Sequence, residues 1–110
     1  MKITDKNSII LEEYRDNQDR LHRIDGPALV YKTGEKFWYI YGVHHRVGGP
    51  ATERPNGDCY WLQYGLLHRT DGPAVTSGNG NCESYYYKGD PITKEEFYSP
   101  EFQIKIVMEG

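Results

Sequence analysis

The sequence predicts an all-β fold: a curved antiparallel sheet of three 23-residue β-hairpin repeats with a short C-terminal helical cap. Three observations predict it: a motif that recurs at a fixed period, a glycine turn that recurs with it, and a strand-like aromatic segment after the turn. A fixed period of this length is typical of repeat architectures. The motif copies are LHRIDGPA at 21–28, HHRVGGPA at 44–51 and LHRTDGPA at 67–74.

Length and charge narrow the class of protein. The 110 residues fit one compact domain, with a degenerate N-terminal cap (1–20), the three-repeat sheet (21–92) and a C-terminal cap (93–110). The net charge of −3 disfavours nucleic-acid binding, which needs a basic surface. No segment approaches the roughly 20 apolar residues of a membrane span, and Met1–Lys6 is too polar to begin a secretory signal. We therefore expect a cytoplasmic protein that does not contact membranes.

The first full repeat sets the template for the other two. Residues 28–31 have the composition of a strand, 32–35 form a turn, and 37–41 form an aromatic strand. We expect a positive φ at the turn glycine, which recurs as Gly34, Gly57 and Gly80. The pairs Tyr41-Gly42 and Tyr64-Gly65 should close tight hairpins. Tyr14 lies one period before Phe37, so the N-terminal segment resembles a worn half-repeat, as end repeats often do.

The third repeat and the C-terminus depart from the template. In the third repeat the closing glycine, Gly89, comes one residue late, which predicts a bulge or a slip. Thr93 and Glu96 fit the capping box of a short helix. Ser99-Pro100 fits the start of a second helix, yet Phe102, Ile104, Ile106 and Met108 alternate as in a strand. The sequence is compatible with either a helix or a strand at 100–108.

The two cysteines are also one period apart. Cys59 and Cys82 should occupy the same position in neighbouring repeats, about 9.5 Å apart across two strands. A disulfide needs Cα atoms within about 7 Å. Both thiols are therefore expected to be free.

The motif itself predicts a corner in the chain. Pro27 has no N–H and interrupts the strand ladder, Asp25 can bind backbone amides of the bend, and His22 can bind the same carboxylate. A residue that the architecture requires recurs in every repeat, whereas a catalytic residue is normally needed once. Equivalent histidines would span about 19 Å over two repeats, too far for one metal ion. We expect neither a catalytic role, a metal nor a cofactor for this set, which comprises His22, Arg23, Asp25, His45, Arg46, His68, Arg69 and Asp71.

Two substitutions make the middle copy of the motif different. His44 stands where the other copies have leucine, and Gly48 stands where they have aspartate. Functional sites are often found where a local rule is broken. Tyrosine and tryptophan favour interfaces because they offer large contact area with few rotors. His44, Trp38 and Trp61 are therefore the candidate binding residues, with neutral drift in one repeat as the alternative.

The motif, the spaced glycine turn and the aromatic segment that ends in glycine resemble the short β-hairpin repeats related to MORN repeats. The resemblance covers about 21–92. Variants that carry this motif are familiar in uncharacterised proteins of bacteriophages and large DNA viruses. The resemblance implies an elongated, twisted sheet that acts as an interaction scaffold rather than a particular chemistry.

These observations favour a non-enzymatic protein-binding scaffold. The resemblance suggests a small phage-encoded inhibitor of a host defence protein, acting in the host cytoplasm. The alternative is a protein that sequesters a small ligand or nucleotide through histidine, arginine and aromatic side chains. An enzyme that uses His44 or His45 is the least favoured. The sequence leaves the partner and any self-association open.

Overall fold

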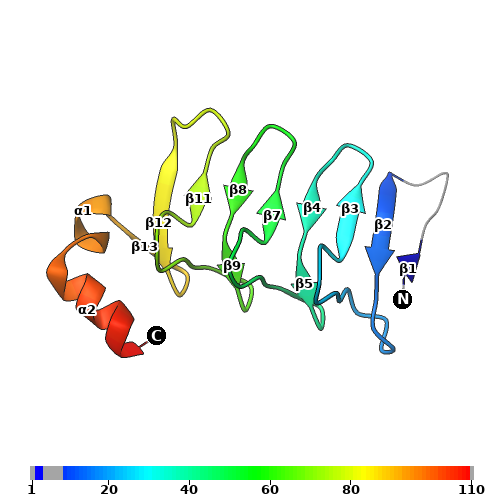
Figure 1. The fold of residues 1–110 in the computed structure, drawn as a ribbon, viewed down its shortest axis with the longest axis horizontal. Helices are drawn as coiled ribbons and strands as arrows, with labels where there is room; N and C mark the ends of the chain where they lie inside the picture. The colour runs from blue at the N-terminus through cyan, green and yellow to red at the C-terminus, as the bar shows by residue number, and fades with distance from the viewer. Residues whose placement is uncertain (1, 4–8, 110) are drawn as a thin grey trace.

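The structure, a computed structural model, describes residues 2–3 and 9–109 (Figure 1). A main sheet and two small hairpins contain all the strands of this described part. The main-sheet strands are β1 (Lys2–Ile3), β2 (Ile10–Tyr14), β3 (Leu29–Tyr31), β4 (Lys36–Phe37), β7 (Thr52–Glu53), β8 (Cys59–Tyr60), β11 (Val75–Thr76), β12 (Glu83–Tyr87) and β13 (Asp90–Ile92). The small hairpins pair β5 (Tyr39–Ile40) with β6 (Val43–His44), and β9 (Leu62–Gln63) with β10 (Leu66–Leu67).

The repeats stand side by side along one elongated molecule, with principal extents of 51 × 32 × 18 Å. The nine strands follow the order β1-β2-β3-β4-β7-β8-β11-β12-β13, and every neighbouring pair is antiparallel. Polar turns form the upper edge in Figure 1, the small hairpins project from the lower edge, and the two helices cover the C-terminal end. The predicted all-β fold with a helical cap is confirmed.

The aromatic segment 37–41 does not form the single strand that we expected. β4 ends at Phe37, and β5 begins at Tyr39 after the chain bends out of the main sheet. The hairpin then turns at Tyr41 and Gly42, whose φ angles of 47° and 79° lie in the left-handed region. A two-residue turn with positive φ at both positions matches the twist of its strands. The predicted tight hairpin is confirmed here and at Tyr64-Gly65.

Alanines of the motif form the thin core of the repeats. Ala28, Ala51 and Ala74 are fully buried. Each donates its N–H to a carbonyl of the second strand of its own repeat. The nitrogen of Ala51, for example, lies 2.8 Å from the carbonyl oxygen of Tyr60 in β8. A small side chain lets the corner approach the strand closely, so the repeats bury little aliphatic volume.

The late glycine of the third repeat results from one extra residue in the β11–β12 turn. The N–H of Arg54 reaches the carbonyl of Asp58, four residues on, whereas that of Ser77 reaches Cys82, five residues on. All later contacts of this repeat shift by one residue. Cys82 therefore lies in the turn and Cys59 in β8, so our expectation of one shared position is wrong. Both thiols are free.

The N-terminal half-repeat is also one residue out of period. The N–H of Tyr14 binds the carbonyl of Ala28 as that of Trp38 binds the carbonyl of Ala51. Tyr14 is thus the counterpart of Trp38, and not of Phe37 as the 23-residue period predicted.

Two helices close the C-terminal end: α1 (Lys94–Phe97) and α2 (Pro100–Glu109). The Thr93 side chain accepts the N–H of Glu96, which confirms the predicted cap. The Ser99 hydroxyl accepts the N–H of Phe102, and the residues left open between helix and strand are helical. No helix in the described part of the chain is long and apolar enough to cross a membrane.

Candidate functional site

The guanidinium of each motif arginine lies between a ring of the preceding repeat and a glycine of its own motif. The Cζ-to-ring-centroid distances are 4.1 Å for Arg23 over Tyr14, 4.0 Å for Arg46 over Trp38 and 3.8 Å for Arg69 over Trp61. A Cβ atom added to the motif glycine would come within 2.6 to 3.0 Å of the same Cζ, at Gly26, Gly49 and Gly72. A larger residue at this position would have to displace the guanidinium, and cation–π stacking on the ring favours the position that the glycine leaves open.

In the first and third corners, a motif aspartate completes the arginine site. Arg23 Nε donates to Asp25 Oδ1 over 2.9 Å, and Arg69 Nε donates to Asp71 Oδ1 over 2.8 Å. The hydrogen bond from Arg23, together with its charge, lowers the pKa of Asp25. Sequence reasoning gave Asp25 the backbone amides and His22 as partners, whereas its bond runs to the guanidinium two residues away.

The middle corner lacks this carboxylate. Gly48 has a φ of 84°, and a Cβ there would meet no atom within 4 Å. Arg46 Nη1 donates to the Pro50 carbonyl over 3.0 Å and to Glu53 Oε2 over 3.2 Å. Among the described residues, Nε of Arg46 has no acceptor. Arg46 is therefore held like the other two arginines, but its Nε N–H, which binds an aspartate in the other two, stays open.

The motif histidines connect each corner to a hairpin tip. Their Nδ1 atoms accept the backbone N–H groups of the tip residues, each over 2.9 Å: His22 from Tyr41, His45 from Tyr64 and His68 from Lys88. The Nδ1 atom must be unprotonated to accept, so each ring carries its proton on Nε2. Burial, followed by the charge of Lys88, lowers the pKa of His68.

His44 makes its contacts inside the molecule. Its Nε2 lies 2.9 Å from the Ala51 carbonyl oxygen and 2.8 Å from Thr52 Oγ1, and its ring stacks on Tyr39 at 5.0 Å. Burial lowers its pKa, opposed by the hydrogen bond to Ala51. His44 thus binds the polar groups of its own corner, and a role in partner binding stays a prediction.

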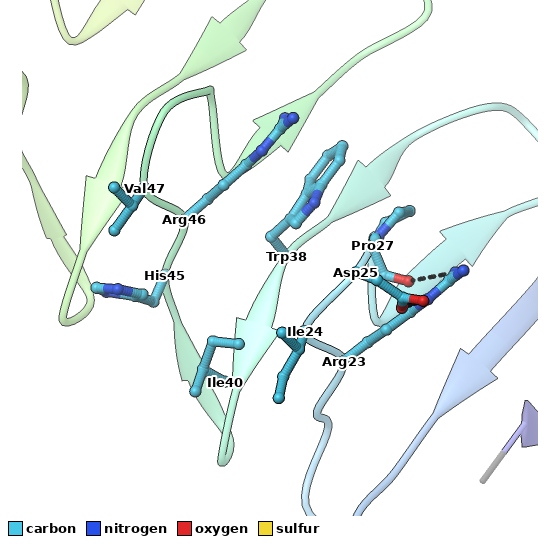
Figure 2. Close-up of a pocket in the computed structure, with 10 residues that line it drawn as sticks. Arg23, Ile24, Asp25, Pro27, Trp38, Ile40, His45, Arg46 and Val47 are labelled. Carbon is cyan, nitrogen blue, oxygen red and sulfur yellow. Dashed lines mark hydrogen bonds and ion pairs between the residues drawn. The ribbon is translucent and has the colours of Figure 1, made fainter.

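The two tryptophans are half-buried and lie in successive repeats, each covered on one face by arginine. Trp38 lines a hollow of about 690 Å³ between the first and second corners, together with Ile24, His45 and Arg46 (Figure 2). Neither His44 nor Trp61 lines this hollow. The three candidate residues therefore do not form one site.

The hairpin tips present a second surface, which sequence reasoning missed. Tyr41, Val43, Tyr64 and Leu66 are exposed large side chains, and Tyr64 is 79% exposed. A hollow of about 350 Å³ lies between the first two tips, lined by Ile40, Tyr41, Val43, His45 and Tyr64. We call the four exposed side chains of Tyr41, Val43, Tyr64 and Leu66 the tip row. The available signal was the Tyr-Gly pair, because a two-residue turn places its residues at the end of the hairpin, and connecting segments usually lie on the protein surface.

Charged groups flank the tip row. The Arg20 Cζ lies 5.1 Å from the ring centroid of Tyr41, and Lys88 replaces the tip tyrosine in the third repeat. Among the described residues, no three His, Cys, Asp or Glu side chains gather so as to hold a metal ion.

Comparison of the chain with models of protein families, with curated proteins and with solved structures gave no match. The resemblance to MORN-related repeats thus stays a prediction based on the motif.

Proposed function

We propose that the protein is a non-enzymatic scaffold that binds another protein along the tip row. The main support for this proposal is the exposure of Tyr41, Val43, Tyr64 and Leu66 on adjacent hairpin tips. Aromatic residues are enriched in the core of interfaces, and tyrosine supplies large contact area with a polar end. Two exposed tyrosines and two exposed aliphatic side chains on adjacent tips favour a macromolecular partner.

The tips are also rigidly held, which lowers the entropic cost of binding. His22 accepts the N–H of Tyr41 and stacks on its ring at 4.2 Å. His45 accepts the N–H of Tyr64, and the two rings are tilted by 54° with their centroids 4.7 Å apart. A preorganised surface loses less conformational freedom when a partner binds. The corner histidines would therefore support binding without touching the partner.

For the partner we keep the expectation from the motif, a host protein that a phage-encoded inhibitor would block. A second candidate is a small ligand or nucleotide. It is favoured by the hollow between the first two corners, whose volume of about 690 Å³ suits a small molecule and whose wall carries Arg46, His45 and Trp38.

Site-specific photocrosslinking tests the proposal. A photoreactive phenylalanine analogue at position 64 should capture one discrete protein from host lysate, whereas the same analogue at Thr33, in the turn between β3 and β4, should not. In protein that carries the analogue at position 64, Tyr41→Lys should reduce the recovery of that protein about tenfold, as expected for loss of an interface anchor, and Thr33→Lys should leave recovery unchanged. Equal capture from positions 64 and 33 would contradict the proposal, and a nucleotide that stabilises the protein without any protein partner would favour the second candidate.

A further inference from the structure

The middle corner differs from its neighbours by one missing carboxylate. The outer corners pair Arg23 Nε with Asp25 and Arg69 Nε with Asp71. The middle corner has Gly48 at that position, and Nε of Arg46 has no acceptor among the described residues. The same molecule thus shows twice which chemical group completes this site.

The donor is already held in place. The guanidinium of Arg46 lies between the Trp38 ring, 4.0 Å away, and Gly49, and its Nη1 binds the carbonyl of Pro50. About 30% of its side chain is exposed. A guanidinium that is already oriented loses little entropy when it binds a carboxylate, and such charge-assisted bonds are stronger than neutral ones.

Glu53 does not occupy the Nε donor of Arg46. It binds Nη1 of Arg46, at the other end of the guanidinium from Nε. In the first corner, Arg23 has a carboxylate on Nε, from Asp25, and another from Glu12 at 4.0 Å from Nη1. Two carboxylates around one motif arginine are therefore tolerated in this fold.

The surroundings suit a side chain offered by another protein. Space at Gly48 is open, since a Cβ there meets nothing within 4 Å, and the neighbouring Val47 is 73% exposed. Val47, Arg46 and His45 line the same hollow, and His45 also lines the one between the tips. A partner that covers the tip row would extend to this corner.

We propose that Arg46, at the middle corner, is an open carboxylate-binding site that takes an aspartate or glutamate side chain of the protein partner, in the place that Asp25 and Asp71 fill in the other corners. The proposal rests on the proposed function for the identity of the partner. The site itself can be tested on the isolated protein.

The first experiment follows the arginine Nε–Hε resonances by NMR during titration with N-acetyl-aspartate N-methylamide, a model of an aspartate within a chain. We expect a saturable shift at Arg46, at least about fivefold larger than the shifts at Arg23 and Arg69, whose Nε atoms are occupied. The matched asparagine compound and sodium chloride should produce no such shift. Equal responses at all three arginines, or an equal response to chloride, would overturn the site.

The second experiment uses a matched pair of variants, Gly48→Asp and Gly48→Asn. Both add a side chain at a positive φ that aspartate and asparagine tolerate, so the backbone cost is shared. Only Gly48→Asp supplies an internal carboxylate, as the outer corners do. It should abolish the Arg46 response and lower partner recovery in the crosslinking assay by about tenfold, the loss of one charge-assisted bond, whereas Gly48→Asn should keep both.

The outcomes separate the two proposals. Equal partner recovery with Gly48→Asp and Gly48→Asn would overturn the carboxylate docking and leave the scaffold function standing. A saturable Arg46 response without any captured protein would contradict the scaffold function, and with it the assignment of the carboxylate to a protein partner.

Discussion

The repeats and the C-terminal cap cover an equivalent aromatic ring with different residues. Within the repeats, the ring of one repeat is covered by the arginine of the next, as Arg69 covers Trp61. Tyr85 takes the position of Trp61 in the last repeat, and no further motif follows it. Phe97 and Tyr98 pack against Tyr85 instead, at 4.8 and 5.6 Å. Where no next repeat supplies a guanidinium, a small aromatic core replaces it.

This difference places most of the buried aromatic volume at one end of the molecule. Phe97 and Phe102 of the cap form a hydrophobic cluster with Tyr85 and Tyr87 of the last repeat, whereas the buried hydrophobic side chains of the first two repeats are Ala28, Val30 and Ala51. The hydrogen bond to Tyr98, together with burial, raises the pKa of Tyr85 to about 12. We therefore expect the free energy of unfolding to fall most when a large side chain of the cap is truncated. In the repeats, we expect it to fall when a side chain is enlarged.

The largest effect is expected from Phe97→Ala, which should lower the free energy of unfolding by about 3–5 kcal/mol, the usual cost of truncating a buried phenylalanine. Phe97 is 1% exposed and contacts Tyr85, Tyr98 and Phe102. Urea denaturation measures the change. The control Ile104→Ala, on the exposed side of α2, should change the free energy little, and equal losses for both variants would contradict the cap as the packed end.

A smaller loss is expected from added volume in a corner. Gly49→Ala should destabilise the protein by about 0.5–2 kcal/mol, the range of a cation–π contact, because the new Cβ would lie 2.6 Å from Cζ of Arg46 and push the guanidinium off the Trp38 ring. Thermal and urea unfolding would report the loss, with Val47→Ala as a nearly neutral control. An unchanged Gly49→Ala protein would show that the stacking is dispensable.

The third prediction concerns pH. Burial lowers the pKa of His68 in the folded protein below its ordinary 6.5, so the unfolded chain binds protons more readily. Stability is then complete above about pH 6.5 and falls as the pH decreases towards the folded pKa. Urea denaturation at pH 7.5 and 5.5 measures the slope. His68→Asn keeps an acceptor for the N–H of Lys88 but cannot titrate, so its slope should be shallower; an identical slope would assign the pH dependence to other groups, His44 first among them.

The smallest effect is expected from Asp71→Asn. The ion pair with Arg69 is largely exposed, with the Asp71 side chain 74% accessible, and exposed ion pairs contribute about 0–1 kcal/mol. The arginine keeps its ring and the Pro73 carbonyl. A loss as large as that of Gly49→Ala would show that the carboxylate, rather than the stacking, holds the corner, and would strengthen the case for an external carboxylate at Arg46.

Much of the fold was predictable because its signals are local. The tight hairpins at Tyr41-Gly42 and Tyr64-Gly65, the cap at Thr93 and the positive φ of the turn glycines each depend on residues a few positions apart. The candidate site was less predictable. The exposure of Tyr64 depends on the direction in which its turn projects, and the inward position of His44 depends on Thr52 across the corner.

The sequence by itself determined the number of repeats, their antiparallel hairpins and the helix starts, since these follow from periodicity, backbone φ preferences and capping groups. Only the tertiary structure decided that 100–109 is a helix. The alternation of Phe102, Ile104 and Ile106 fits a strand, but Phe102 and Ile106 pack together on the tyrosine cluster while Ile104 remains exposed. It also decided the role of the motif arginine, because the ring that holds each guanidinium belongs to the preceding repeat and reaches it only through the register between repeats.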